Sequence, residues 1–78
     1  MVHIVEVYRD GEELAAPMAE IRSWLDKERI QPTVFRMSLL PGGTIFRLEF
    51  KAAREAEAFA RALAGRVIRD EHAGSVAA

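Results

Sequence analysis

Residues 33–50, TVFRMSLLPGGTIFRLEF, place two β-rich runs on either side of Gly42 and Gly43. Because glycine reaches the positive φ angles of a tight turn without strain, this segment predicts a β-hairpin. A turn centred on the two glycines pairs Leu39 with Phe46, Met37 with Leu48, Phe35 with Phe50, Arg36 with Glu49, and Ser38 with Arg47. Most of the large apolar residues then share one face and the charges share the other, so the hairpin needs a core on one side only.

The chain before the hairpin predicts a strand and then a helix. Residues 2–8, VHIVEVY, are β-branched and aromatic, and a turn signal follows at residues 9–11. A helix is expected to begin near Ala16, because Pro17 is tolerated only in a first helical turn. Pro32 prevents that helix from continuing. The apolar stripe predicted along it is Leu14, Met18, Ile21 and Leu25.

The chain after the hairpin predicts a second helix and a short strand. Residues 52–64 are rich in alanine and form a good helix, with Gly65 as the expected stop. The following residues 66–70, RVIRD, can add a short edge strand. The apolar stripe predicted along this second helix is Ala52, Ala56, Phe59 and Leu63.

The order strand, helix, strand, strand, helix, short strand predicts an α+β fold of the ferredoxin-like split βαβ type. Two helices then pack on one face of an antiparallel sheet. We expect one domain over residues 1–70 and a flexible tail over residues 71–78. The strand residues expected in the core are Val5, Val7, Phe35, Met37, Leu39, Phe46, Leu48 and Phe50.

Composition limits the class of protein. With 78 residues and a formal net charge of -1, the chain is long enough for one small core only. It has no cysteine, which favours a cytoplasmic location over a disulfide-bonded secreted domain. No run of about 18 apolar residues is present, so no membrane partner is expected. The near-neutral charge also lacks the basic excess typical of proteins that bind phosphate backbones.

The sheet face opposite the helices is the predicted partner-binding surface. It mixes apolar side chains with charges, a pattern more typical of an association surface than of a solvated one. We therefore expect a small non-catalytic module that associates with itself or with a protein partner, for example as an adaptor or inhibitor of a larger assembly. An edge formed by Trp24 on the first helix is an alternative surface. The candidate partner-binding residues on the sheet are Ile4, Glu6, Tyr8, Val34, Arg36, Ile45, Arg47 and Glu49.

The segment RLEF followed by EAEAFARALAGRVI resembles the RNA-recognition motif domain. The resemblance covers most of the chain and implies a four-stranded platform for nucleic acid, here carried by Arg36, Arg47 and Tyr8. This chain has Ile45 and Arg47 where that family has stacking aromatics, and Thr44 where it has glycine. Nucleic-acid binding is thus an alternative function. Small-ligand sensing at a dimer interface is a second one.

Residues able to support catalysis or hold a cofactor are sparse. His3 and His72 are far apart in the sequence, whereas a metal site needs converging ligands. The serines have no neighbouring histidine or lysine to activate them. Arg36 and Arg47 can clamp a small anion, but cross-strand pairing of Arg36 with Glu49, and of Arg47 with Glu6 or Glu49, is the preferred interpretation. We expect no enzyme activity, no cofactor and no metal.

Overall fold

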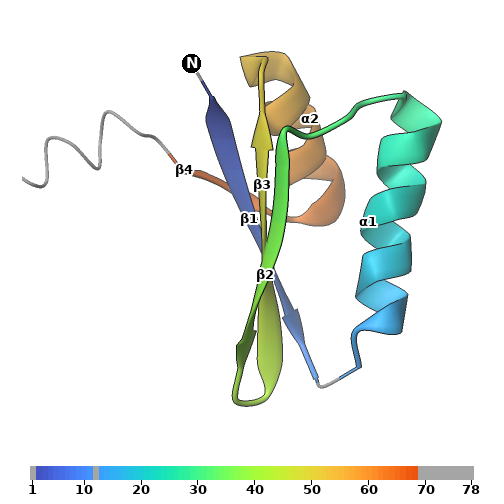
Figure 1. The fold of residues 1–78 in the computed structure, drawn as a ribbon, viewed down its shortest axis with the longest axis vertical. Helices are drawn as coiled ribbons and strands as arrows, with labels where there is room; N and C mark the ends of the chain where they lie inside the picture. The colour runs from blue at the N-terminus through green and yellow to red at the C-terminus, as the bar shows by residue number, and fades with distance from the viewer. Residues whose placement is uncertain (1, 12, 69–78) are drawn as a thin grey trace, which may run out of the picture.

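The computed structural model describes residues 2–11 and 13–68 of the chain. The predicted tail at residues 71–78 lies outside the described residues. Figure 1 shows the order of the elements along the chain. They are β1 (His3–Asp10), α1 (Ala15–Glu28), β2 (Val34–Leu40), β3 (Gly43–Phe50), α2 (Ala53–Leu63) and β4 (Arg66–Ile68).

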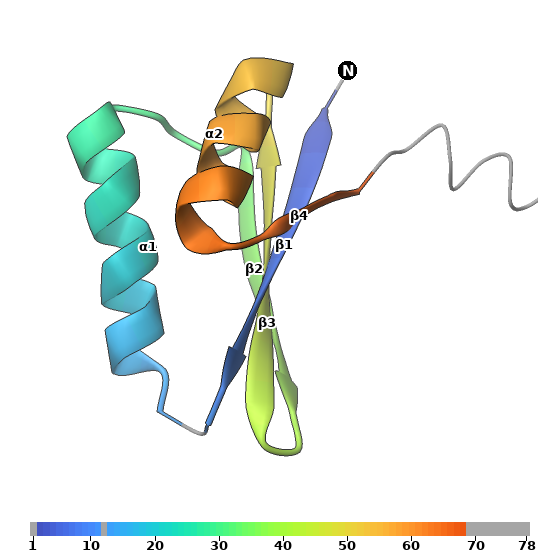
Figure 2. The same ribbon diagram turned by 180° about the vertical axis from the view of Figure 1, so that it is seen from behind.

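The four strands form one antiparallel sheet in the order β2-β3-β1-β4. Both helices lie on the same side of this sheet and leave the other side open (Figures 1 and 2). This confirms the predicted α+β fold, and the strand order is that of a ferredoxin-like layout. Neither described helix is long and apolar enough to cross a membrane.

The hairpin forms, but its register differs by two residues from the prediction. Leu40 pairs with Gly43 and Leu39 with Thr44, so Gly43 belongs to β3 and not to the turn. The turn residues are Pro41 and Gly42, and only Gly42 has a positive φ, of 80°. Proline followed by a positive-φ glycine is the pattern of a type II turn. The observed pairs are Phe35 with Leu48, Arg36 with Arg47, Met37 with Phe46, and Ser38 with Ile45.

The core lies between the helices and the two central strands. Val5, Val7, Phe46, Leu48 and Phe50 are fully buried on the strands, and they pack against residues of both helices. Aromatic rings meet inside this core. Phe59 of α2 lies 5.5 Å from the Trp24 ring and 5.3 Å from the Phe50 ring, measured between centroids. The buried helix residues are Ile21, Leu25, Ala56, Phe59, Ala60 and Leu63.

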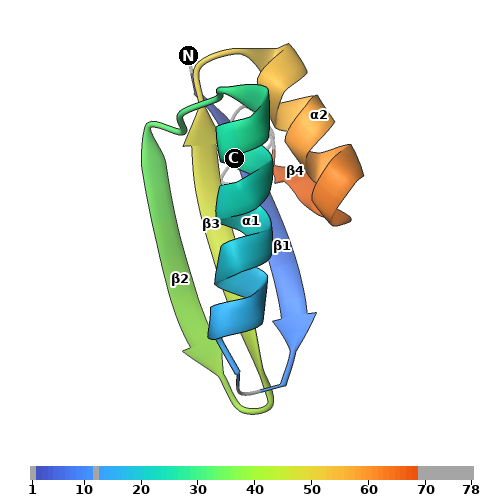
Figure 3. The same ribbon diagram turned by 90° about the vertical axis from the view of Figure 1, so that its right-hand side faces the viewer.

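The outer strand β2 is only partly covered, which corrects two predicted core residues. Phe35 packs against the core and its ring lies 6.3 Å from that of Phe46. Met37 and Leu39 point to the same face, yet they are 45% and 70% exposed. The reason is visible in Figure 3, where β2 extends beside α1 instead of beneath it. The apolar side chains of this edge strand thus alternate as in a half-buried strand, although only part of the strand is covered.

The end of α2 also differs from the prediction. Ala64, not Gly65, takes the left-handed conformation, with φ of 59°. Gly65 is needed for a close approach, because a β-carbon there would stand 2.8 Å from Cγ2 of Val7 and 3.0 Å from the Glu6 carbonyl oxygen. The chain therefore passes directly over β1 before it forms β4.

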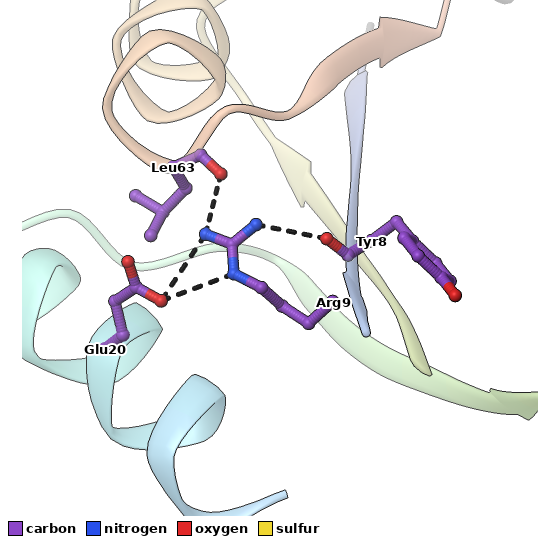
Figure 4. A network of polar contacts seen from close by, with 4 residues as sticks. All are labelled: Tyr8, Arg9, Glu20 and Leu63. Carbon is purple, nitrogen blue, oxygen red and sulfur yellow. Dashed lines mark hydrogen bonds and ion pairs between the residues drawn. The ribbon is translucent and has the colours of Figure 1, made fainter. Parts of the chain in front are cut away.

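Arg9 and Asp10 complete β1, although the sequence pattern assigned them to a turn. The Arg9 side chain reaches from β1 toward both helices (Figure 4). Its Nη2 donates a hydrogen bond of 2.8 Å to the carbonyl oxygen of Leu63 and lies 3.4 Å from the Glu20 carboxylate. Its Nη1 donates to the Tyr8 carbonyl oxygen at 3.1 Å. Arg9 thereby links the strand to α1 and to the last carbonyl of α2.

Candidate binding face

The open face of the sheet contains every residue predicted to bind a partner. Strand alternation assigns side chains to it, because the intervening residues Val5, Val7, Phe46, Leu48 and Phe50 are buried under the helices. The predicted residues found here are Ile4, Glu6, Tyr8, Val34, Arg36, Ile45, Arg47 and Glu49.

The register aligns four charged residues across the middle of this face. Arg36 lies opposite Arg47, Arg47 opposite Glu6, and Glu6 opposite Arg66. We call these four residues the arginine row. Arg66 was not among the predicted residues, because the sequence could not show how β4 aligns with β1.

The Glu6 carboxylate forms ion pairs with two guanidinium groups of the arginine row. Oε2 of Glu6 lies 3.7 Å from Nη1 of Arg47, and Oε1 lies 3.9 Å from Nη2 of Arg66. These ion pairs are long and partly solvated, since the Arg47 and Arg66 side chains are 46% and 79% exposed. Pairs of this kind contribute at most about 1 kcal/mol. Both arginines therefore keep donors available for another anion.

The predicted pairing of Arg36 with Glu49 is wrong. The two-residue change of register places Arg36 opposite Arg47 instead. Within the described part of the chain, no carboxylate lies within 4.0 Å of the Arg36 guanidinium. Like charges directly opposite each other on a sheet are unfavourable. An anion that binds between Arg36 and Arg47 would relieve this repulsion.

Apolar residues lie above and below the arginine row. Val34, Ile4 and Ile68 occupy one flank, together with Glu49. Ile45 and Tyr8 occupy the other. Ile4 is only 5% exposed, so it offers a partner little area, contrary to its predicted role. In the register it lies between Glu49 on β3 and Ile68 on β4, away from either sheet edge.

Tyr8 is the exposed aromatic residue of this face, at 49% exposure. Its ring lies over Gly43, where an added β-carbon would stand 2.7 Å from two ring carbons. A hydrogen bond to the Asp10 carboxylate raises the pKa of the Tyr8 phenol, and the negative charge of Asp10 acts in the same direction. Because Gly43 has no side chain, it leaves room for the Tyr8 ring. This explains why a glycine is present at a position that follows the turn.

A shallow cavity opens beside Tyr8 at the end of the arginine row. Its volume is about 360 Å³. The side with Glu6 and Arg66 is charged, whereas Ile45 and the Tyr8 ring are apolar. The lining residues are Glu6, Tyr8, Ile45, Ala64, Gly65 and Arg66.

The remaining candidates do not converge on a second site. His3 lies on the helix side of β1 opposite Phe50, and His72 lies outside the described residues. No group of three His, Cys, Asp or Glu residues in the described ranges is placed to hold a metal ion. Trp24 packs edge-on against Phe59, so it closes the margin of the core. The groove beside Trp24 measures about 260 Å³ and is lined by both helices.

The fold and the face together define a small ferredoxin-like α+β domain with an arginine-lined open sheet. No protein-family model matches the sequence, and neither curated proteins nor solved structures gave a significant match.

Proposed function

We propose that this chain is a small non-catalytic module whose open sheet face binds an acidic segment of a protein partner. The observation that carries the proposal is the arginine row, in which Arg47 and Arg66 share the single carboxylate of Glu6 and Arg36 has no carboxylate within 4.0 Å in the described part of the chain. Guanidinium groups form bidentate hydrogen bonds with carboxylates, so a segment rich in Asp and Glu is the kind of ligand that this row can bind. We place the module in the cytoplasm, because the sequence has no cysteine.

The apolar flanks favour a protein segment over a free anion. Ile45 and Val34 are half-buried on either side of the arginine row, and the cavity beside Tyr8 is partly apolar. A peptide that alternates acidic and apolar side chains would place its carboxylates on the arginines and its apolar residues on these flanks. Such a surface combines the burial of apolar side chains with a preference for partners that carry acidic side chains.

The same charges argue against two copies stacking face to face through this surface. A centred two-fold stacking sets one arginine row on the other, so Arg36, Arg47 and Arg66 of both copies face only the two Glu6 carboxylates. Burying unpaired guanidinium groups is costly because each loses its hydration. The open face therefore suits a partner of opposite charge rather than a second copy.

Nucleic-acid binding is the second candidate, and the placement of Tyr8 favours it. Tyr8 lies on the same face as the arginine row, two residues after Glu6 on β1. A nucleic acid could therefore place its phosphates on the arginines and stack a base on the exposed Tyr8 ring. This arrangement uses one aromatic ring, whereas single-strand platforms usually stack several bases.

Binding of defined probes tests the two candidates. Fluorescence anisotropy is measured with three labelled probes: a peptide that alternates glutamate with leucine, its glutamine-leucine counterpart, and a single-stranded RNA. The full chain is compared with the double variant Arg36→Gln, Arg47→Gln. Arg54→Gln is the matched control, because Arg54 is an exposed arginine on α2, on the helix side of the sheet.

Preferential binding of the acidic peptide, lost in the double variant and kept in Arg54→Gln, supports the proposed function. Tighter binding of RNA than of the acidic peptide, with a steep decrease as salt is added, supports the second candidate instead. Equal binding of all three probes, or binding that the double variant leaves unchanged, contradicts both.

A further inference from the structure

The outer strand β2 presents an unprotected edge. Among the described residues it pairs with β3 alone, and it stands at one end of the sheet. It spans seven residues without proline, and Arg36 is its only charge. The opposite edge strand, β4, has three residues. Edge strands in monomers are usually short, charged or interrupted, because unpaired backbone groups attract another strand. Only β4 meets that description.

Exposed apolar side chains gather along β2. Met37, Leu39 and Leu40 are 45%, 70% and 42% exposed. Met37 and Leu39 point to the helix side of the sheet, and Leu40 points to the open side. A strand added at this edge would therefore cover apolar area on both sides of the sheet while it pairs with the free backbone groups.

We infer that the partner at this edge is a second copy of the chain, bound by antiparallel pairing of β2 with β2 centred on Met37. A two-fold axis normal to the sheet keeps the helices of both copies on one side, so each residue pairs with a residue of its own face. In this register apolar residues pair with apolar residues, and the charged Arg36 pairs with the polar Ser38. The pairs are Met37 with Met37, Phe35 with Leu39, Val34 with Leu40, and Arg36 with Ser38 of the second copy.

Arg36 and Pro41 disfavour the neighbouring two-fold registers. Centring the pair on Arg36 places this guanidinium directly opposite its own copy, which is unfavourable. Centring it on Ser38 places Arg36 opposite Leu40, and brings Pro41, which has no backbone N–H, opposite Phe35. In the register centred on Met37, the two Arg36 residues are diagonal neighbours about 7–8 Å apart. Both side chains are exposed, so solvent and salt screen this repulsion.

The dimer would join the two four-stranded sheets into one sheet of eight strands. The two arginine rows then end at the two-fold axis, one on each side, and lie on one continuous sheet face. A partner with two acidic segments could bind both rows at once, with a gain in apparent affinity. The pairing itself does not depend on the proposed binding function, since it involves the edge of β2 and not the open face.

Cysteine cross-linking tests the register, because the native chain contains no cysteine. The variant Met37→Cys places two thiols directly opposite each other, at a Cα separation of about 4.5–5.5 Å that a disulfide can span. In Leu39→Cys the two thiols are four residues out of register, about 13 Å apart. Under mild oxidation, Met37→Cys is expected to form a covalent dimer at least ten times faster than Leu39→Cys, even though Leu39 is more exposed.

Sedimentation equilibrium of the unmodified chain tests the dimer itself. Wild type is expected to dimerise, and Leu39→Lys to weaken dimerisation about tenfold or more, because the substitution alters two Phe35 contacts at once. Val2→Lys is the control, since Val2 is exposed at 37% and lies away from β2. A wild-type monomer at all concentrations up to the solubility limit, or equal cross-linking of the two cysteine variants, would overturn the inference.

Discussion

Arg9 and Leu63 are 54 residues apart in the chain, yet the Arg9 guanidinium donates a 2.8 Å hydrogen bond to the Leu63 carbonyl oxygen. This carbonyl belongs to the last turn of α2, where backbone acceptors have no partner within the helix. The Arg9 side chain is 24% exposed, so the bond is partly protected from water. A strand residue thus completes the end of a helix, and it fixes how α2 docks on β1.

Replacement of Arg9 by Met is expected to lower the free energy of unfolding by about 1–3 kcal/mol, because it removes a charge-assisted bond to a partly buried acceptor. Glu20→Gln separates this effect from the ion pair. That pair spans 3.4 Å with Glu20 half exposed, so its loss should cost less than about 1 kcal/mol. Urea unfolding followed by the fluorescence of the single tryptophan measures both. Equal losses would show that the ion pair, and not the bond to Leu63, is what matters.

Two adjacent small residues at the end of α2 should respond in opposite directions. Ala64→Gly is expected to raise the free energy of unfolding by up to about 1 kcal/mol, because Ala64 has a left-handed φ of 59° that glycine adopts without strain. Gly65→Ala is expected to lower it by about 1–3 kcal/mol, because the new methyl group collides with Val7 and the Glu6 backbone. Thermal unfolding of the pair is the measurement. Stabilisation by Gly65→Ala would contradict the packing of this loop on β1.

The ionisation of Tyr8 can be read directly, because it is the only tyrosine in the chain. Its pKa is raised chiefly by the hydrogen bond to Asp10, so phenolate absorbance should appear at a higher pH than in an unfolded peptide. Asp10→Asn should lower that midpoint, whereas Asp26→Asn on α1 should not move it. Because the folded chain holds this proton more tightly, stability should decrease as the pH rises above the unfolded value of about 10. An unchanged midpoint in Asp10→Asn would contradict the contact.

Neutralising Glu6 should strengthen binding of the acidic peptide. The Glu6 carboxylate lies within 4.0 Å of both Arg47 and Arg66, so Glu6→Gln frees their donors and adds one unit of positive charge to the row. We expect affinity to rise roughly two- to fivefold, the equivalent of about 0.5–1 kcal/mol for a partly exposed pair. Glu57→Gln, an exposed change on α2, is the control and should have no effect. Weaker binding after Glu6→Gln would indicate that Glu6 itself contacts the ligand.

The predicted face assignments on β2 and β3 held although the predicted register was wrong. A shift of two residues moves Arg36 from Glu49 to Arg47 but leaves every side chain on its own face, because strand side chains alternate with a period of two. The candidate residues on the open face could therefore be located without the correct partners. The partners depend on which residue of Pro41-Gly42-Gly43 takes the positive φ, and the sequence allows both glycines to do so.

Local patterns were sufficient for the strands, the helices, the antiparallel sheet and the apolar face of each element, since all of these follow from backbone periodicity and turn chemistry. Local patterns did not determine which parts of the sheet the helices cover, or which residues distant in the sequence become neighbours. Exposure of Met37 and Leu39 depends on where α1 docks, and the place of Arg66 beside Glu6 depends on how β4 aligns with β1. The contact of Arg9 with Leu63 likewise exists only once α2 has packed. Which side chains become neighbours across elements is decided by three-dimensional packing, because no spacing along the chain encodes it.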